Sequence, residues 1–355
     1  MKIYDVAVIG GGPAGAIFTK ELMHRCPKMK VILIDGQSDK NKKVCGGLLA
    51  PDAQREFASL GLTLPKEILS DPQIFSVETV DLSKRLVRHY QRHYLNMDRF
   101  AFDKWLVSLI PDSAEIFDGR CVEISDPDDD GHIRLKLKGE GGELSVFASY
   151  IVGADGANSS VRRHFFGRMP KQYTAIQQYF CRSDEGLPPY SCIFDSETSD
   201  SCSWTVRKDG YMIYGGAFDK QNCKDAFLRQ KSRFEAFSGI SLGEPVKTEA
   251  CLLTSPRRYR DFITGKGKAF LIGEAAGFIS ASSFEGISSA FISGRLLAKA
   301  FAEKDPANIQ KAYAKSTRRL KLKLYLKMQK RRILCSPLCR AIIMKSGIQS
   351  VKRYK

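Results

Sequence analysis

A glycine-rich turn near the N-terminus constrains the fold of this chain more than any other feature. Residues 3–9 (IYDVAVI) form a short, mostly apolar run of the kind found in buried parallel strands. They lead into residues 10–15 (GGGPAG), which fit the pattern G-x-G-x-x-G. A helix is expected from Ala14 to about Arg25, followed by a second apolar strand that ends in Asp35. This order of strand, glycines, helix, strand and acid predicts a Rossmann-like βαβ unit that binds a dinucleotide.

Each glycine of the pattern has a physical role in such a unit. Gly10 makes the tight turn, and Gly12 lets the backbone approach a pyrophosphate. Gly15 lets the helix pack closely on the strand, so that the phosphates face the positive end of the helix. Asp35 follows Gly15 by twenty residues and is placed to accept hydrogen bonds from a ribose 2′-OH, while its charge disfavours the 2′-phosphate of NADP. The alternative is a glycine-rich turn that holds no ligand.

The positive charge of the chain is concentrated at its C-terminal end. The net charge is +17 over 355 residues, but residues 306–355 hold fifteen Lys and Arg and no acid, which leaves the rest nearly balanced. Residues 318–332 mix eight cations with leucines in a helical pattern. Plotted at ~100° per residue, these charges do not segregate onto one face. The segment 311–334 could contact an anionic membrane, pack its leucines as a solvated helix, or, least favoured, bind nucleic acid.

The length and the cysteine pattern limit the class of protein. A chain of 355 residues is long enough for two lobes around a large core. No apolar run is long enough to span a bilayer, and the N-terminus is a core strand, so we expect a cytoplasmic protein, with peripheral contact at the inner face of the membrane if the basic tail binds lipid. The ten cysteines show no zinc spacing, which predicts neither a metal site nor a disulfide framework.

Other segments combine small residues with a polar side chain. Residues 44–49 (VCGGLL) place two glycines beside Cys45, which indicates either backbone close to a ligand or a simple turn. Residues 153–156 (GADG) follow a buried strand with an acid between glycines. Residues 273–277 (GEAAG) follow another strand, and residues 284–290 then open a helix whose N-terminus can offer NH groups to an anion.

The middle of the chain is rich in aromatic and strand-forming residues. Residues 169–253 therefore predict a second lobe with a mostly antiparallel sheet and an apolar face. Most of its aromatics are expected in ordinary core, and Trp204 and Tyr211 are the ones expected to reach a pocket. The five histidines form no cluster, so no general base is nominated.

The predicted fold is α/β, with a Rossmann-like βαβ domain, a second sheet domain and a C-terminal helical tail. The first domain is discontinuous and is expected to comprise residues 1–75, 96–165 and 255–305. The substrate domain is expected to comprise residues 76–95 and 166–254, followed by a basic helical tail at 306–355.

These motifs together resemble the FAD-dependent oxidoreductases with the p-hydroxybenzoate hydroxylase fold, whose nucleotide-binding domain is of the GR2 type. More narrowly, the chain is similar to the geranylgeranyl reductase-like group and its CbrA-type flavoproteins. The resemblance covers essentially the whole chain and implies noncovalent FAD between the lobes. It implies cofactor contacts from Gly10, Gly12, Pro13, Ala14, Gly15, Asp35, Gly36, Cys45, Gly46, Gly47, Arg99, Val122, Asp155, Gly156, Gly273, Glu274, Gly286 and Ile287. It implies a substrate pocket lined by Trp204, Tyr211 and Phe284.

The likeness to the prenyl reductases rests on residues 43–48 (KVCGGL) and 203–211 (SWTVRKDGY). Glu274 stands where the family usually has aspartate, and Val206-Arg207 where the prenyl reductases have Phe-Pro, so the substrate pocket is expected to differ. Cys45 is the one candidate for a catalytic acid, with a packing role as its alternative.

The resemblance implies a reductase or dehydrogenase of an apolar, isoprenoid-like molecule. The alternatives are a monooxygenase that uses NAD(P)H and O2, and a membrane-surface FAD protein without turnover. Only one dinucleotide-binding unit is visible in the sequence, so the electron donor is expected to dock transiently: NAD(P)H, a ferredoxin or a quinone.

Overall fold

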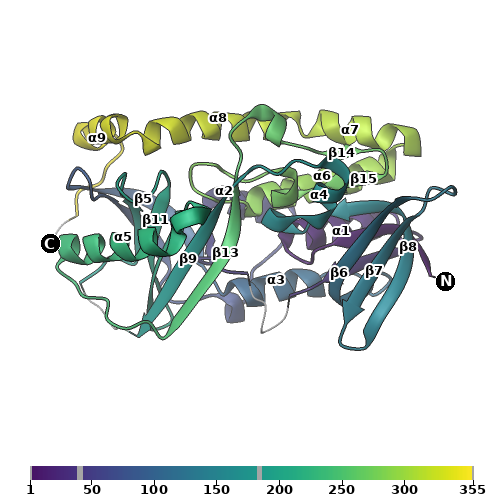
Figure 1. Ribbon diagram of the computed structural model, residues 1–355, viewed down its shortest axis with the longest axis horizontal. Coiled ribbons are helices and arrows are strands. Elements are labelled where there is room, and N and C mark those ends of the chain that lie inside the picture. The colour runs from purple at the N-terminus through teal and green to yellow at the C-terminus, as the bar shows by residue number, and fades with distance from the viewer. Residues whose placement is uncertain (1, 38–42, 182–185, 354–355) are drawn as a thin grey trace.

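The computed structural model describes residues 2–37, 43–181 and 186–353. Residues 1, 38–42, 182–185 and 354–355 belong to the predicted domains but lie outside the described residues. The described strands form two sheets that lie side by side, and a run of C-terminal helices extends along both of them (Figure 1). The predicted α/β fold, with two sheets and a helical C-terminal region, is confirmed.

The first sheet is built around a buried parallel strand. Its strands are β1 (Ile3–Ile9), β2 (Val31–Asp35), β6 (Glu115–Pro127), β7 (Ile133–Gly139), β8 (Gly142–Gly153), β14 (Gly265–Lys266) and β15 (Ala269–Leu271). β1 pairs in parallel with both β2 and β8, and β15 extends the parallel set beyond β8. Val6, Ala7 and Val8 are completely buried, because helices or strands cover both faces of a parallel sheet. The second half of β6 and the first half of β8 pair antiparallel with β7 as an extension of this sheet.

A group of closely packed helices covers this sheet. They are α1 (Pro13–Arg25), α2 (Pro51–Ser59), α3 (Arg99–Ser108), α4 (Ser160–Phe166) and α6 (Ile287–Glu303). α1 and α6 are in intimate contact, because a Cβ at Gly294 would lie only 2.7 Å from the carbonyl oxygen of Ala14. α3 begins at an aspartate cap, where the Asp98 side chain accepts a hydrogen bond from the Ala101 NH.

The second sheet is mostly antiparallel, as predicted. In spatial order its strands are β13 (Lys247–Ser255), β9 (Lys171–Cys181), β12 (Tyr211–Phe218), β11 (Cys202–Lys208), β10 (Tyr190–Phe194), β4 (Ile74–Asp81), β5 (Leu86–Asn96) and β3 (Leu48–Leu49). Helix α5 (Cys223–Ser238) packs Phe227 and Phe234 onto Tyr214 of β12. β3 lies within residues predicted for the first domain, yet it joins this sheet because it pairs with the end of β5.

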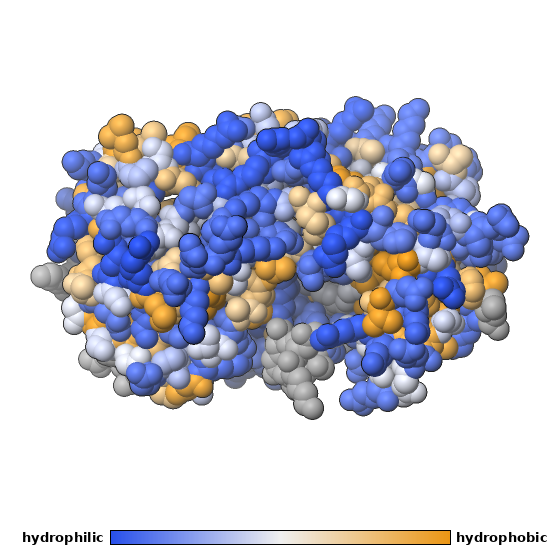
Figure 2. Space-filling view, in the orientation of Figure 1, coloured by the Kyte–Doolittle hydropathy of each residue, from blue (hydrophilic) through white to orange (hydrophobic). Residues whose placement is uncertain are grey.

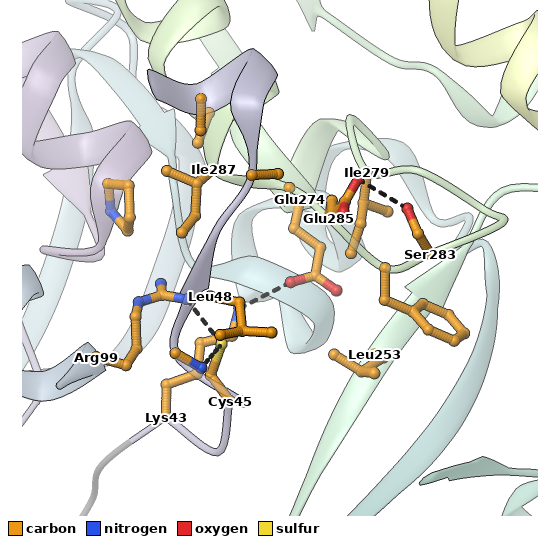
Figure 3. Close-up of a pocket in the computed structure, with 18 of the residues that line it drawn as sticks. Lys43, Cys45, Leu48, Arg99, Leu253, Glu274, Ile279, Ser283, Glu285 and Ile287 are labelled. Carbon is orange, nitrogen blue, oxygen red and sulfur yellow. Dashed lines mark hydrogen bonds and ion pairs between the residues drawn. The ribbon is translucent and has the colours of Figure 1, made fainter. Parts of the chain in front are cut away.

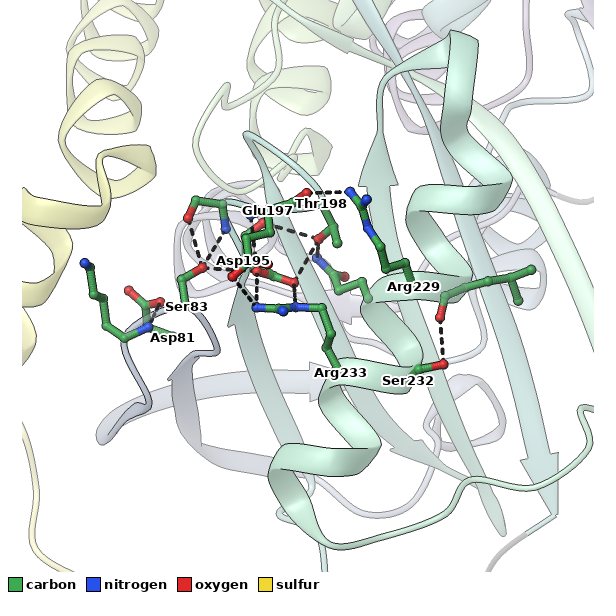
Figure 4. Close-up of polar contacts among 12 residues, drawn as sticks. Asp81, Ser83, Asp195, Glu197, Thr198, Arg229, Ser232 and Arg233 are labelled. Carbon is green, nitrogen blue, oxygen red and sulfur yellow. Dashed lines mark hydrogen bonds and ion pairs between the residues drawn. The ribbon is translucent and has the colours of Figure 1, made fainter.

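A buried carboxylate ties α5 to the second sheet (Figure 4). Asp195, at the end of β10, is 1% exposed and accepts hydrogen bonds from Arg233 of α5 at 2.8 Å and from the Ser83 hydroxyl at 3.1 Å. The Thr198 hydroxyl donates to the same carboxylate. Because a buried charge is costly unless it is paired and hydrogen-bonded, this cluster fixes the helix against the strands.

Over its described residues the basic tail forms three α-helices: α7 (Ile309–Ser316), α8 (Arg318–Cys335) and α9 (Pro337–Ser346). Leu320, Leu324 and Met328 form an inner stripe on α8 that is buried in the core of the first sheet. Of the alternatives for the tail, packing of leucines on the first domain is therefore observed. No helix among the described residues is long and apolar enough to cross a bilayer.

The tail also contacts the second sheet through buried arginines. Arg331 donates to the Tyr173 hydroxyl at 3.1 Å and to a carboxylate oxygen of Asp200 at 2.9 Å. Arg340 donates to Asp81 at 2.7 Å, with side chains only 3% and 0% exposed. α8 and α9 thus connect the two sheets.

We expect Arg340→Met to destabilise the protein, because it leaves the Asp81 carboxylate buried without its partner. Removing one member of a buried pair costs about 3–5 kcal/mol of unfolding free energy. The double variant Arg340→Met/Asp81→Asn should recover a large part of this loss, since no charge remains buried. Urea unfolding measures both, with the exposed Arg319→Met as a control that changes stability by less than about 0.5 kcal/mol. A wild-type midpoint for Arg340→Met would contradict the structural role of the pair.

Candidate functional site

A large cavity of about 620 Å³ opens at the carboxyl ends of β1, β2 and β8. A second cavity of about 200 Å³ adjoins it and reaches between the two sheets. Both are lined in part by the same residues, namely Gly12, Lys43, Ala154 and Gly156. Open parallel sheets bind ligands outside the carboxyl ends of their strands. The joined cavities form an elongated site for a ligand with two different ends, and we call them the nucleotide cavity and the inner cavity.

The packing of the chain itself requires three of the four glycines in the turn at residues 10–15. Gly10 has φ +111°, and a Cβ at Gly15 would lie 1.9 Å from the carbonyl oxygen of Gly10. A Cβ at Gly11 would lie 2.5 Å from Cγ of Asp35. Gly12 differs, because the nearest atom to its Cβ position is 4.0 Å away. The chain leaves room for a side chain at Gly12. Packing therefore does not require this glycine, and its effect is to expose the backbone to the cavity that it lines.

The carboxylates predicted for the nucleotide are both in this cavity. Asp35 accepts hydrogen bonds from the Gln37 NH and from Nζ of Lys104, each at 3.1 Å. One oxygen of Asp155 accepts from the NH and hydroxyl of Ser160 at 2.7 and 2.9 Å. Its other oxygen is buried without a partner among the described residues. Burial raises the pKa of Asp155 above its usual value.

An ion pair lies where the two cavities adjoin. Nζ of Lys43 is 2.9 Å from Glu274, whose other oxygen accepts from the Thr254 NH at 2.9 Å. Burial alone would raise the pKa of Glu274, but Lys43 and the Thr254 NH outweigh it and hold that pKa below its ordinary value. The side chain longer than the family's aspartate thus reaches both partners. The departure at Glu274 is accommodated within the chain.

A fully buried arginine holds the main chain of the turn that carries Glu274. Arg162 is 0% exposed and donates to the carbonyl oxygens of Ala275 and Asp261, each at 2.8 Å. Burial lowers the pKa of Arg162 to about 10. The guanidinium links α4 to the turn by hydrogen bonds to the main chain.

Cys45 lies on the wall of the inner cavity and is surrounded by donors (Figure 3). Nη1 of Arg99 lies 3.6 Å from its sulfur, and the Gly47 NH donates to the sulfur at 3.4 Å. Asp103 holds the same guanidinium by accepting from Nε of Arg99 at 2.8 Å. Burial opposes ionisation of the thiol, but Arg99, the Gly47 NH and Lys43 prevail, so the pKa of Cys45 is lowered. A thiol of this kind is poised to give up its proton.

The two glycines after Cys45 allow a tight turn and a close approach of this backbone to another segment of the chain. Gly47 has φ +65°, and a Cβ there would lie 2.2 Å from the carbonyl oxygen of Met97. Nζ of Lys208 donates to the same carbonyl oxygen at 2.5 Å. The segment is thereby fixed with its backbone on the wall of the inner cavity.

Most predicted site residues line one of the cavities. Those in the nucleotide cavity are Gly10, Gly12, Asp35, Gly36, Asp155 and Gly156. Those in the inner cavity include Pro13, Ala14, Cys45, Gly46, Gly47, Arg99, Trp204, Glu274, Phe284, Gly286 and Ile287. Gly15 and Gly273 line neither cavity and act in packing: a Cβ at Gly273 would lie 2.7 Å from Cβ of Ala14.

Two predicted residues lie elsewhere. Val122 is 53% exposed and lines neither cavity, whereas its neighbour Cys121 does line the nucleotide cavity. Val122 is left unpaired at an irregularity between the paired residues Cys121 and Glu123, and its side chain turns to solvent. Tyr211 is 40% exposed and lines neither cavity, because it begins β12 and its ring contacts Tyr179 on the neighbouring strand.

The sequence analysis missed a polar group in the inner cavity. Glu285 accepts hydrogen bonds from the Tyr94 hydroxyl and the Ser283 hydroxyl, each at 3.0 Å. The preceding residue, Phe284, has φ +54°, an unusual conformation for a bulky side chain and one that concentrates at functional sites. Glu285 stood within a segment already singled out, but Tyr94 gave no local signal.

The residues present fit FAD. The nucleotide cavity provides a glycine turn, an acid for a ribose and an unpartnered carboxylate oxygen, and α1 begins without a side-chain cap or an acid in its first turn. α6 likewise begins at Gly286, in the inner cavity, without a side-chain cap. Such helix N-termini favour anions and developing negative charge. The turn and Asp35 would hold the ADP half, and residues around Cys45 and Gly286 would surround the flavin ring.

We expect Gly12→Ala to weaken FAD binding without unfolding the protein. Gly12 has φ −68°, which alanine adopts freely, and the chain has room for the methyl group. The Kd for FAD should rise by about tenfold or more, which is ~1.4 kcal/mol. Titration of FAD-free protein by flavin fluorescence gives the Kd, and thermal unfolding checks the fold. Gly141→Ala, in a hairpin with nothing within 4 Å, is the matched control. Unchanged affinity in Gly12→Ala would contradict a pyrophosphate at this backbone.

We expect Arg99→Met to slow alkylation of Cys45 at neutral pH. Removing the guanidinium raises the pKa of the thiol, and the thiolate is the reactive form. The pH profile of iodoacetamide labelling, resolved by mass spectrometry in FAD-free protein, should therefore shift upward. Lys104→Met removes a cation from the same helix, but one that pairs with Asp35, so it should leave the profile unchanged. Equal profiles for wild type and Arg99→Met would show that Arg99 does not activate the thiol.

Comparisons with known proteins identify the family of this chain. A family described as "FAD binding domain" matches residues 3–180. The CbrA proteins of Escherichia coli O9:H4 (strain HS) and of Escherichia coli K12 are 46% and 45% identical over all of this chain, which covers 96% and 100% of those proteins.

Solved structures share the fold at low sequence identity. A geranylgeranyl bacteriochlorophyll reductase-like protein of Thermoplasma acidophilum has a TM-score of 0.78 at 17% identity, over 95% of this chain and 88% of that one. The p-nitrophenol 4-monooxygenase PnpA of Pseudomonas putida has a TM-score of 0.69 at 16% identity, over 98% and 94%. The resemblance inferred from the sequence is confirmed: this chain belongs to the FAD-binding family that includes the CbrA proteins, and it is an FAD-dependent oxidoreductase.

Proposed function

We propose that the protein reduces a carbon–carbon double bond of an apolar, isoprenoid-like substrate in the inner cavity. The observation that carries this proposal is the half-buried Cys45 thiol, an acid with a lowered pKa that lies beside Arg99 on an otherwise largely apolar wall. The likeness to a protein described as geranylgeranyl bacteriochlorophyll reductase-like supports the substrate class.

The inner cavity offers an apolar surface to a hydrocarbon chain. Its apolar side chains include Val44, Leu48, Trp204, Val206, Leu253, Ile279, Phe284 and Ile287. Each buried methylene contributes about 0.8 kcal/mol to binding by the hydrophobic effect. Isoprene units, which carry no hydrogen-bonding groups, match such a wall.

Reduction of a double bond requires a hydride at one carbon and a proton at the other. Reduced FAD, when bound, supplies the hydride and is oxidised. The proton comes from Sγ–H of Cys45, and the thiolate that remains is stabilised by Arg99 at 3.6 Å and by the Gly47 NH. General acids work best when their pKa lies near the working pH, and the lowered pKa of Cys45 moves it in that direction. A transient donor such as NAD(P)H, a ferredoxin or a reduced quinone would supply the two electrons that the reaction consumes.

We expect a geranylgeranyl substrate to reoxidise the photoreduced holoprotein without oxygen. The flavin absorbance near 450 nm follows the reaction, and mass spectrometry should find a product heavier by two hydrogens. Cys45→Ser should slow the step by about 10²–10⁴-fold, the usual contribution of a general acid. Cys181→Ser, at an exposed position outside both cavities, should react as wild type does. Reoxidation at the wild-type rate in Cys45→Ser would remove Cys45 from the proton transfer.

A monooxygenase is the second candidate, favoured by the polar group at Glu285. The carboxylate, held by the Tyr94 and Ser283 hydroxyls, could bind the hydroxyl group of a phenolic substrate. PnpA, described as a p-nitrophenol 4-monooxygenase, shares the fold. In this reaction one oxygen atom of O2 enters the substrate and the other becomes water, with NAD(P)H as the reductant.

Oxygen consumption separates the two candidates. If one mole of hydroxylated product forms for each mole of O2 consumed, the result supports the monooxygenase and overturns the reductase. In that case Glu285→Gln should raise the KM for a phenol by about tenfold or more, because the substrate loses a charged hydrogen-bond acceptor.

A further inference from the structure

The outward face of α8 carries apolar side chains that the core does not use. Leu322, Leu326 and Ile333 are 56%, 59% and 48% exposed, although each is large and apolar. At ~100° per residue they fall within about 40° of one another, on the side of the helix opposite the inner stripe. α8 therefore has two apolar stripes on opposite sides. This explains why its charges do not segregate onto one face when the helix is plotted from sequence.

α9, the next helix along the chain, also exposes apolar side chains. Leu338 and Ile342, one turn apart, are 69% and 61% exposed. With the three residues of α8 we call them the outer ridge. Among the described residues, nine of the nineteen large hydrophobic side chains that are exposed lie between 306 and 353, so the ridge is a concentration and not scattered surface. In Figure 2 apolar groups gather at the upper left over α9, beside hydrophilic groups along the top over α8.

Exposed cations flank the outer ridge on both sides. Arg319 and Lys330 lie along one side of it, and Arg318 and Arg332 along the other. No acidic residue occurs between 306 and 355 to offset them. An apolar row with cations at both margins is the pattern of a helix that lies in a membrane interface, where long basic side chains reach the lipid headgroups.

We propose that the outer ridge of α8 and α9 binds the surface of an anionic lipid bilayer. The bilayer is the occupant that uses both features of the surface: its acyl region takes up the apolar row, and its headgroups pair with the flanking cations. Nucleic acid would engage the cations by phosphate contacts and leave the apolar row in water. The inner stripe and the buried arginines keep α8 attached to the rest of the protein in this arrangement.

The same helix adjoins the rim of the inner cavity. Nζ of Lys323 and Nζ of Lys327 are each 3.2 Å from a carboxylate oxygen of Asp52, and Asp52 lines the inner cavity. A bilayer on the outer ridge would therefore lie across α8 from one wall of that cavity. The membrane contact does not depend on the proposed reaction, and binding is measured without turnover.

Vesicle flotation of the full-length, FAD-containing protein tests the proposal. On vesicles of phosphatidylglycerol and phosphatidylcholine in equal parts we expect binding at 0.1 M salt, and weaker binding on phosphatidylcholine alone. The variant Leu322→Gln/Leu326→Gln/Ile333→Gln keeps every cation and should lower the partition coefficient by about tenfold or more. Arg319→Ser/Lys330→Ser/Arg332→Ser should lower it on anionic vesicles and reduce its dependence on salt. Phe75→Gln/Val246→Gln alters side chains that are 68% and 58% exposed elsewhere, and should bind as wild type does.

Flavin absorbance and thermal unfolding establish that each variant is folded. Three results would overturn the proposal: no flotation of wild type with anionic vesicles, equal flotation of wild type and the glutamine variant, or retention on duplex DNA in place of vesicles. A wild-type dimer that the glutamine variant converts to monomer, with no vesicle binding, would assign the ridge to a second copy of the chain instead.

Discussion

The structure depends on the close approach of α1 to its neighbours. Gly15 lets the helix sit against the carbonyl oxygen of Gly10, and Gly294 lets α6 pass over the carbonyl oxygen of Ala14. Any larger side chain at these glycines would push the helix away from the sheet. α1 begins between the two cavities, because Gly12 lines both of them. Its packing therefore fixes the position of the helix N-terminus relative to both ends of the cofactor site.

The charges in and around the inner cavity reflect a second constraint, that ionic groups out of water need partners. Lys43 is paired with Glu274, Arg99 with Asp103, and Lys208 with a main-chain carbonyl. All three cations act on the pKa of Cys45 or are acted on by it. Positive charge held in this way stabilises an anion formed in the cavity, whether on the thiol or on a reduced cofactor.

Features that impose a local backbone demand could be predicted from sequence. The turn at residues 10–15, Asp35 and the Cys45 segment were recognised because their glycines and spacing have a local cause. Val122 lines neither cavity, and the sequence alone does not reveal which face of a long strand a residue takes. Tyr94 with Glu285, like Arg340 with Asp81, joins residues far apart in the chain, and no local pattern announces such a contact. The two apolar stripes of α8 lie on opposite sides, so a plot that looks for one apolar face of that helix does not detect them.

The tail helix has a mechanical consequence for the whole molecule. One end of α8 is buried in the core of the first sheet, while Arg331 and Arg340 are buried against residues of the second sheet. A hinge movement that separated the sheets would have to expose an apolar stripe and break the ionic contacts of two buried arginines at once. α8 therefore acts as a link that restrains the two sheets relative to each other. Any movement that admits a ligand is least costly in segments that α8 does not contact, such as the turn around Phe284.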